Sequence, residues 1–163
     1  MPIDITTLTE IHTALSFIGL AFGIPAMLAL LGRPLSPHWT NLFIIVAVLT
    51  TATGFLFPFN GITPAVGTGI VTTVIFVFMA MARYAFHLAG IWRGIYKAGI
   101  ALNIYFLFFV LIAQAFLKVP LLHDLAPQGN EPPFAIAQLG LLVIFCWLGY
   151  RIKKAARTRE TGV

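Results

Sequence analysis

Long stretches without a formally charged side chain dominate this sequence. Three of them hold 22 residues (11–32), 20 residues (98–117) and 19 residues (132–150), and a fourth runs for 49 residues (34–82). A helix needs about 20 apolar residues to cross the hydrocarbon core of a bilayer. Because 60% of the chain is hydrophobic and only 9% is charged, it lacks the polar surface of a water-soluble fold. The sequence therefore predicts an integral membrane protein.

Turn-forming residues divide the longest stretch into two spans. The segment 57–64 is rich in proline, glycine and asparagine, a composition typical of a tight turn. Ser36 followed by Pro37, and Thr63 followed by Pro64, each combine an N-cap residue with a first-turn proline. A helix is therefore expected to begin at each of these prolines.

The N-terminal segment contains a helix-start pattern of its own. Thr7 and Glu10 have the spacing of a capping box, which predicts a helix beginning near residue 8. The fold class that follows is an all-α bundle of five membrane-spanning helices in a single domain, residues 1–163, with a short basic tail at 151–163. The predicted spans are 8–31, 37–57, 64–88, 95–117 and 133–150.

The basic residues are segregated along the chain. Alternating five spans places nine of the ten lysines and arginines on one side, with Lys118 as the exception. Cytoplasmic loops are enriched in these residues, so we expect the N-terminus outside and the C-terminus in the cytoplasm, in the inner (plasma) membrane. Topology and attraction to anionic lipids account for the net charge of +5 without a nucleic-acid partner. The nine residues are Arg33, Arg83, Arg93, Lys97, Arg151, Lys153, Lys154, Arg157 and Arg159.

Three amides lie within the predicted spans. Asn103 and Gln114 are eleven residues apart, or three helical turns, and therefore share a face. Gln138 lies at a depth similar to that of Gln114 on an antiparallel neighbour, so these two amides are expected to pair in a polar bundle interior. The alternative is that all three line a ligand or ion path, as in a small transporter or channel component.

Cations and aromatic residues mix between the third and fourth spans. Arg83 and His87 are four residues apart and share a helix face, and Tyr84, Trp92 and Arg93 lie close by in the sequence. We predict that this segment binds the head group of an anionic lipid or the carbonyl of a quinone. The alternative is an interfacial belt in which these side chains only anchor the helices.

Histidines raise two further possibilities. His87 together with another histidine, such as His38, would be needed for a b-type haem. His12, His123, Asp124 and Glu131 fall on the predicted outer side and carry zinc or copper ligand groups. Their spacing is not that of a fixed metal motif, so no metal site is predicted.

Catalytic motifs are not recognisable in the sequence. It contains no glycine-rich phosphate loop, nucleophile elbow, His-Glu-x-x-His pair or carboxylate dyad. The leading prediction is therefore a non-enzymatic accessory subunit or lipid- or quinone-binding bundle that self-associates or joins a larger membrane complex. A haem-containing redox protein and a transporter component are the alternatives.

Segments 53–59, 83–93 and 131–138 (TGFLFPF, RYAFHLAGIWR and EPPFAIAQ) resemble small polytopic membrane proteins of bacteria. The resemblance implies a multi-pass membrane protein. It brings no activity, cofactor or catalytic residue with it.

Overall fold

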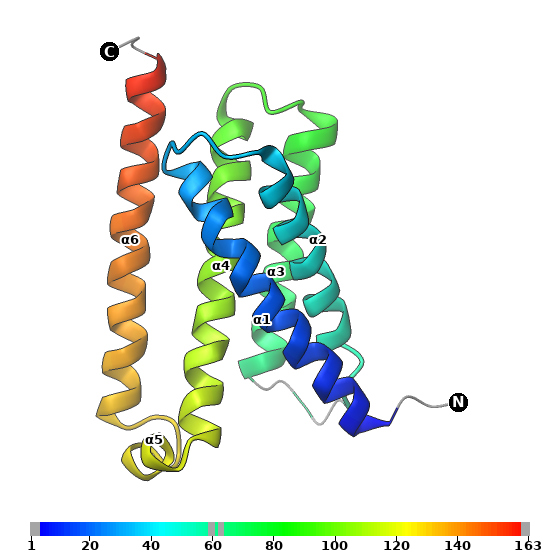
Figure 1. Cartoon of the computed structure of the whole chain (residues 1–163), viewed down its shortest axis with the longest axis vertical. Coiled ribbons are helices and arrows are strands. Elements are labelled where there is room, and N and C mark those ends of the chain that lie inside the picture. Colours follow the sequence, from blue (N-terminus) through cyan, green and yellow to red (C-terminus); the bar gives the residue numbers. More distant parts are fainter. Residues whose placement is uncertain (1–3, 59–60, 62–63, 161–163) are drawn as a thin grey trace. The chain divides into compact units, whose positions relative to one another are not determined.

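The computed structural model describes residues 4–58, 61 and 64–160, and this part of the chain is helical with no strand. Four of its helical segments are long and apolar enough to cross a membrane: Ile5–Leu30, Ala65–Ala85, Ile91–Lys118 and Pro132–Ala156. They indicate an integral, multi-pass membrane protein. In chain order (Figure 1) the elements are α1 (Ile5–Leu30), α2 (Pro37–Gly54), α3 (Pro64–Ala80), the π-helical turn η1 (Met81–Ala85), α4 (Ile91–Lys118), α5 (Pro120–Leu125) and α6 (Pro132–Glu160).

The helix α2 is the fifth long helix, but it is not among those four. It has 18 residues, and its first turns carry the polar side chains of His38, Thr40 and Asn41. Ser36 caps it as predicted, because the Ser36 Oγ accepts a hydrogen bond from the His38 N–H at 3.4 Å. Thr63, the predicted cap of α3, lies outside the described residues.

The observed helices differ from the predicted spans mainly in the residues at which they begin and end. The predicted capping box is wrong, because α1 begins at Ile5 and the Thr9 Oγ1 donates to the Ile5 carbonyl inside the first turns. The predicted end of the last span at Tyr150 is also wrong, since α6 continues to Glu160. Strong helix formers follow Tyr150, and no glycine or proline occurs before Gly162. Most of the predicted basic tail is therefore helical.

The chain divides into two compact units, Met1–Ile104 and Tyr105–Val163. In the first, α1 packs along α2, and Phe43, Ile100 and Ile104 are the largest fully buried side chains. Gly23 of α1 packs against both α2 and α4, since a Cβ there would be 3.5 Å from Phe43 Cε2 and 3.4 Å from Ile104 Cγ1. The absence of a side chain at Gly23 therefore allows α1 to pack closely against both helices.

The ends of these helices gather at two ends of the first unit. The connection after α1 and the connection between η1 and α4 lie together at one end (Figure 1). At the opposite end, His12 near the start of α1 contacts Thr53 near the end of α2. The helix α2 therefore runs antiparallel to α1 and covers most of its length.

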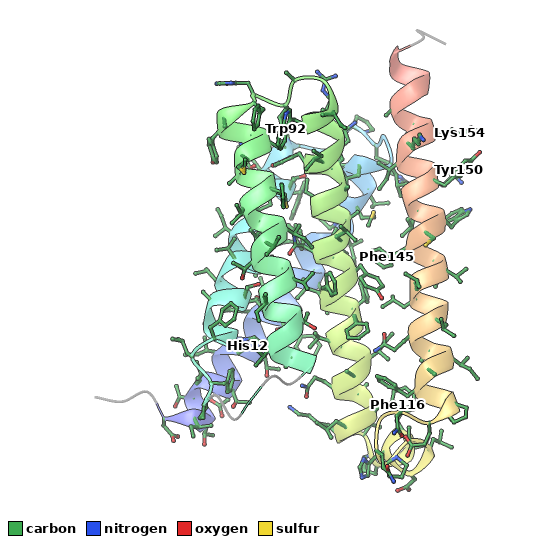
Figure 2. All side chains as sticks on the ribbon, turned by 180° about the vertical axis from the view of Figure 1, so that it is seen from behind. His12, Trp92, Phe116, Phe145, Tyr150 and Lys154 are labelled. Carbon is green, nitrogen blue, oxygen red and sulfur yellow. The ribbon has the colours of Figure 1, made fainter. Side chains whose placement is uncertain are left out.

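The second unit is a helical hairpin formed by the last part of α4 and by α6, joined through the short helix α5. Phe116 packs edge-on against Phe134, with ring centroids 5.5 Å apart. Phe145 packs edge-on against Tyr105, with ring centroids 5.4 Å apart (Phe116 and Phe145 are labelled in Figure 2). Along α4 the contacts run from Tyr105 to Phe116, whereas along α6 they run from Phe145 back to Phe134. The two helical segments are therefore antiparallel.

Candidate functional site

The turn η1 positions Arg83 at one end of the first unit. Backbone hydrogen bonds at this turn span more residues than the four of an α-helix. The Phe86 N–H donates to the Met81 carbonyl, five residues back, and the Leu88 N–H donates to the Ala82 carbonyl, six residues back. The Arg83 Nη1 donates to the hydroxyl of Tyr96 on α4 at 3.2 Å, and its guanidinium carbon lies 5.9 Å from the Tyr96 ring centroid. Because Tyr96 is buried, it holds this arginine against the start of α4.

The connection after η1 has an unusual backbone. His87 (φ 50°) and Leu88 (φ 57°) both occupy the left-handed region, which costs a side-chain-bearing residue about 1–2 kcal/mol. Phe86 and Trp92 on either side of the connection stack face to face, with centroids 3.8 Å apart and planes 4° apart. This stack holds the two ends of the connection together, and its stabilisation helps to offset the backbone strain.

A cleft of about 340 Å³ opens beside Arg83, and we call it the basic cleft. Its polar lining includes Arg83, Arg93 and Lys97, and its apolar lining includes Leu88 and the nearly fully buried Ile100. The remaining lining residues come from the end of α1, the start of α2 and the first turns of α4: Ala29, Leu30, Pro37, Thr40, Asn41 and Tyr96.

The electrostatics of the basic cleft are one-sided. Three of the lining side chains are cationic, and no aspartate or glutamate is among them. The acidic residues described in this unit, Asp4 and Glu10, lie at the start of α1, at the opposite end. The N-terminal ends of α2 and α4 add partial positive charge at the cleft, and the C-terminal ends of α1 and η1 add partial negative charge, so the cationic side chains determine its sign. The arrangement is chemically suited to an anion.

The structure divides the predicted ligand-binding residues into two groups. Arg83 and Arg93 line the basic cleft, whereas Tyr84, His87 and Trp92 are not among its lining residues. Tyr84 is 75% exposed, His87 is also exposed, and the Trp92 ring stacks on Phe86 (Trp92 is labelled in Figure 2).

Sequence reasoning missed four polar lining residues. Lys97 follows Arg93 by four positions, a spacing that places two residues on one helix face and could have identified it. Tyr96 follows Arg93 by three positions, a spacing that also places two residues on one helix face, and could have been found in the same way. Thr40 and Asn41 come from α2, and no local spacing relates them to α4.

The predicted polar interior is formed in part. Asn103 is only 3% exposed, and its Nδ2 donates to the Gly99 carbonyl at 2.9 Å and lies 3.6 Å from Met79 Sδ. The predicted amide pair does not form, because Gln138 Nε2 donates to the Phe109 carbonyl at 3.1 Å and Gln114 is exposed. A backbone carbonyl of the neighbouring helix satisfies the donor instead, while Gln138 Oε1 is buried without a partner.

Two of the predicted outer residues, His12 and Glu131, have separate local partners, whereas His123 Nδ1 is buried without a hydrogen-bond partner. His12 Nδ1 lies 3.0 Å from Thr53 Oγ1, and its ring meets Phe57 edge-on (His12 is labelled in Figure 2). The Glu131 carboxylate accepts hydrogen bonds from the Gln128 and Asn130 N–H groups, each at 3.0 Å. In the described ranges, His123 and Asp124 included, no three histidine, cysteine, aspartate or glutamate side chains are grouped to hold a metal ion.

The carboxylate of Glu131 makes the connection before α6 sensitive to acid. The hydrogen bond from the Gln128 N–H lowers the pKa of Glu131, because it stabilises the charged form. A lowered folded-state pKa contributes stability above the ordinary carboxyl pKa, and this contribution is lost as the pH falls through the folded value. In an NMR titration in micelles, the Gln128 and Asn130 amide resonances should therefore shift below the ordinary glutamate pKa. Glu131→Gln should abolish this titration, and a midpoint at or above the ordinary value would contradict it.

No protein-family model, curated protein or solved structure matches this chain.

Proposed function

We propose that this integral membrane protein is a non-enzymatic helical bundle that binds the anionic head group of a membrane lipid in the basic cleft. The observation that carries the proposal is the convergence of Arg83, Arg93 and Lys97 on one cleft whose lining contains no acidic residue. Near a membrane surface, each basic residue contributes about 1 kcal/mol of attraction to anionic lipids. Phosphate is the anionic group that lipids present at this depth.

The proposal places the protein in the inner (plasma) membrane with five spans. Its N-terminus is then outside the cell and its C-terminus in the cytoplasm. The 18 residues of α2 extend over about 27 Å at about 1.5 Å per residue, so the helix reaches from head-group depth across most of the roughly 30 Å of a hydrocarbon core. Its polar first turns lie at the cleft end, where head groups would surround them. The positive-inside rule then assigns the basic cleft to the cytoplasmic leaflet.

Aromatic side chains near the cleft support a position at the membrane interface. Tyr84 and Trp92 occupy the same end of the first unit as the three cations, and tyrosine and tryptophan are enriched at head-group depth. The predicted anchoring role suits these two residues, while the cleft residues provide the binding.

Phosphate is favoured over the other predicted ligands by the composition of the cleft. A quinone carbonyl is neutral and gains no charge–charge attraction from the three cations, whereas a phosphate does. A b-type haem needs histidine ligands, and none of the lining residues is a histidine. The roles of accessory subunit and transporter component stay predictions.

Native mass spectrometry of the protein in mild detergent tests the proposal. Wild-type protein should retain anionic phospholipid, and the double variant Arg93→Ala/Lys97→Ala should retain roughly thirtyfold less, from about 1 kcal/mol per cation. The matched control Arg151→Ala/Lys153→Ala removes the same charge from α6, outside the cleft, and should lose much less lipid than the cleft variant. Equal loss in both double variants, or no anionic lipid on the wild-type protein, would overturn the proposal.

A further inference from the structure

The charge in the basic cleft exceeds what a common phospholipid would neutralise. Three cationic side chains line the cleft, whereas a phosphodiester head group carries a single negative charge on its phosphate. Such a ligand would leave two cations without a counter-charge beside them. Arg83 and Arg93 are exposed and Lys97 is half-buried, so water screens their mutual repulsion in part. A phosphate with two negative charges would leave one cation without a counter-charge.

We infer that the basic cleft recognises a phosphomonoester, a terminal phosphate that carries about two negative charges at neutral pH. The inference rests on the proposed function and specifies the ligand class of the same site. A terminal phosphate has three acceptor oxygens. Arg83 lines the cleft from η1, and Arg93 and Lys97 line it from α4. Three cations on two elements can each donate to a different oxygen of one phosphate.

Uncharged donors complete the recognition. The Asn41 amide and the Thr40 hydroxyl line the cleft from α2, on an element other than the two that carry the cations. Arg83 donates through one of its nitrogens to Tyr96, and this bond orients the rest of the guanidinium. A volume of about 340 Å³ is at the lower end of ligand pockets, which begin at about 300 Å³. It therefore suits a phosphate with a small substituent.

The apolar part of the lining bears on where the phosphate comes from. Ala29, Leu30 and Ile100 line the cleft beside the cations, so a ligand with an apolar portion next to its phosphate would also bury surface there. A phosphomonoester lipid has this composition, and a soluble phosphomonoester shares only the phosphate. The experiment separates the two sources.

The test compares lipids on the wild-type protein, so it does not depend on whether a variant folds. Binding is measured by native mass spectrometry in mild detergent, with phosphatidic acid as the phosphomonoester and phosphatidylglycerol of the same acyl chains as the phosphodiester. At pH 7.5 phosphatidic acid should bind about fivefold more tightly, the effect of one added charge at about 1 kcal/mol. At pH 5 the preference should disappear, because the second pKa of a phosphomonoester is about 6. No histidine or acidic side chain lines the cleft, so the phosphate is the group there that changes charge.

Two further arms identify the source and the residues. Glycerol 3-phosphate at the same concentration should fail to displace phosphatidic acid if the ligand is a lipid, and should displace it if the ligand is a soluble phosphomonoester; either result supports recognition of a terminal phosphate. Arg93→Ala/Lys97→Ala should abolish the preference, and Arg151→Ala/Lys153→Ala should keep it.

The failures of the inference and of the proposed function are distinguishable. Equal affinity for the two lipids at pH 7.5, with binding that is still lost in Arg93→Ala/Lys97→Ala, would overturn the phosphomonoester inference and leave the proposed function in place. Absence of binding by either lipid would overturn both.

Discussion

Cysteines placed near the two ends of the chain should react with a membrane-impermeant maleimide from opposite sides of the membrane. Asp4 and Lys153 are exposed and flank the first and last spans, so Asp4→Cys and Lys153→Cys in a Cys146→Ala background provide the two sites. With five spans, position 4 should be labelled in intact cells and position 153 only after permeabilisation. In the proposed topology α2 crosses the bilayer beside α1, which makes the number of crossings odd.

A third site distinguishes this arrangement from one in which only the four most apolar helices cross. Leu121 in α5 is 74% exposed, and Leu121→Cys should be labelled in intact cells together with position 4. If α2 stayed on one side of the membrane, positions 4 and 153 would react from the same side and position 121 from the opposite side. Labelling of that kind would contradict the five-span topology. It would place the end of α1 and the start of α4, which both line the basic cleft, on opposite sides of the membrane.

Replacing Gly99 with alanine should destabilise the first unit strongly. A Cβ at Gly99 would lie 2.7 Å from Met79 Sδ and 3.3 Å from Ile75 Cγ2, so α3 and α4 could not keep their present separation there. Met79 is only 3% exposed and also contacts Asn103, which leaves its side chain little room to move. Overpacking of this kind costs about 1–3 kcal/mol. The measurement is the thermal unfolding midpoint in detergent, which should fall.

Two companion variants make the expectation specific. Gly94→Ala changes another glycine of α4 around which nothing lies within 4 Å, and it should leave the midpoint unchanged or raise it slightly. Met79→Ala combined with Gly99→Ala should be less destabilised than the sum of the two single changes, since the shortened side chain removes the clash. If Gly99→Ala were as stable as Gly94→Ala, the close approach of α3 and α4 would be disproved.

Helix starts marked by proline were predicted well, and helix ends were not. The predicted starts at Pro37 and Pro64 agree with those of α2 and α3, because a proline has no N–H to donate and its φ suits a first turn. The ends at Leu88 and Tyr150 were wrong. The third span gives way to η1 before the left-handed residues, and α6 continues through its basic segment.

The candidate site was predicted as one segment, whereas the structure builds it from several. Arg83 and Arg93 are close in sequence and share the cleft, so local reasoning identified both. It also included His87, because helical spacing would place that side chain beside Arg83. The left-handed backbone at His87 ends the helical spacing, and His87 is not among the lining residues.

Composition and charge order alone indicated a membrane protein with its cations gathered on one side, because the cost of placing charge in hydrocarbon depends on residue type and position along the chain. The tertiary structure decided which of those cations share a cleft, and it supplied Thr40 and Asn41 from α2. It also decided that Gln138 bonds to the Phe109 carbonyl and not to Gln114. Such choices depend on which helix faces meet, and every apolar face in hydrocarbon has nearly the same affinity for lipid as for another helix.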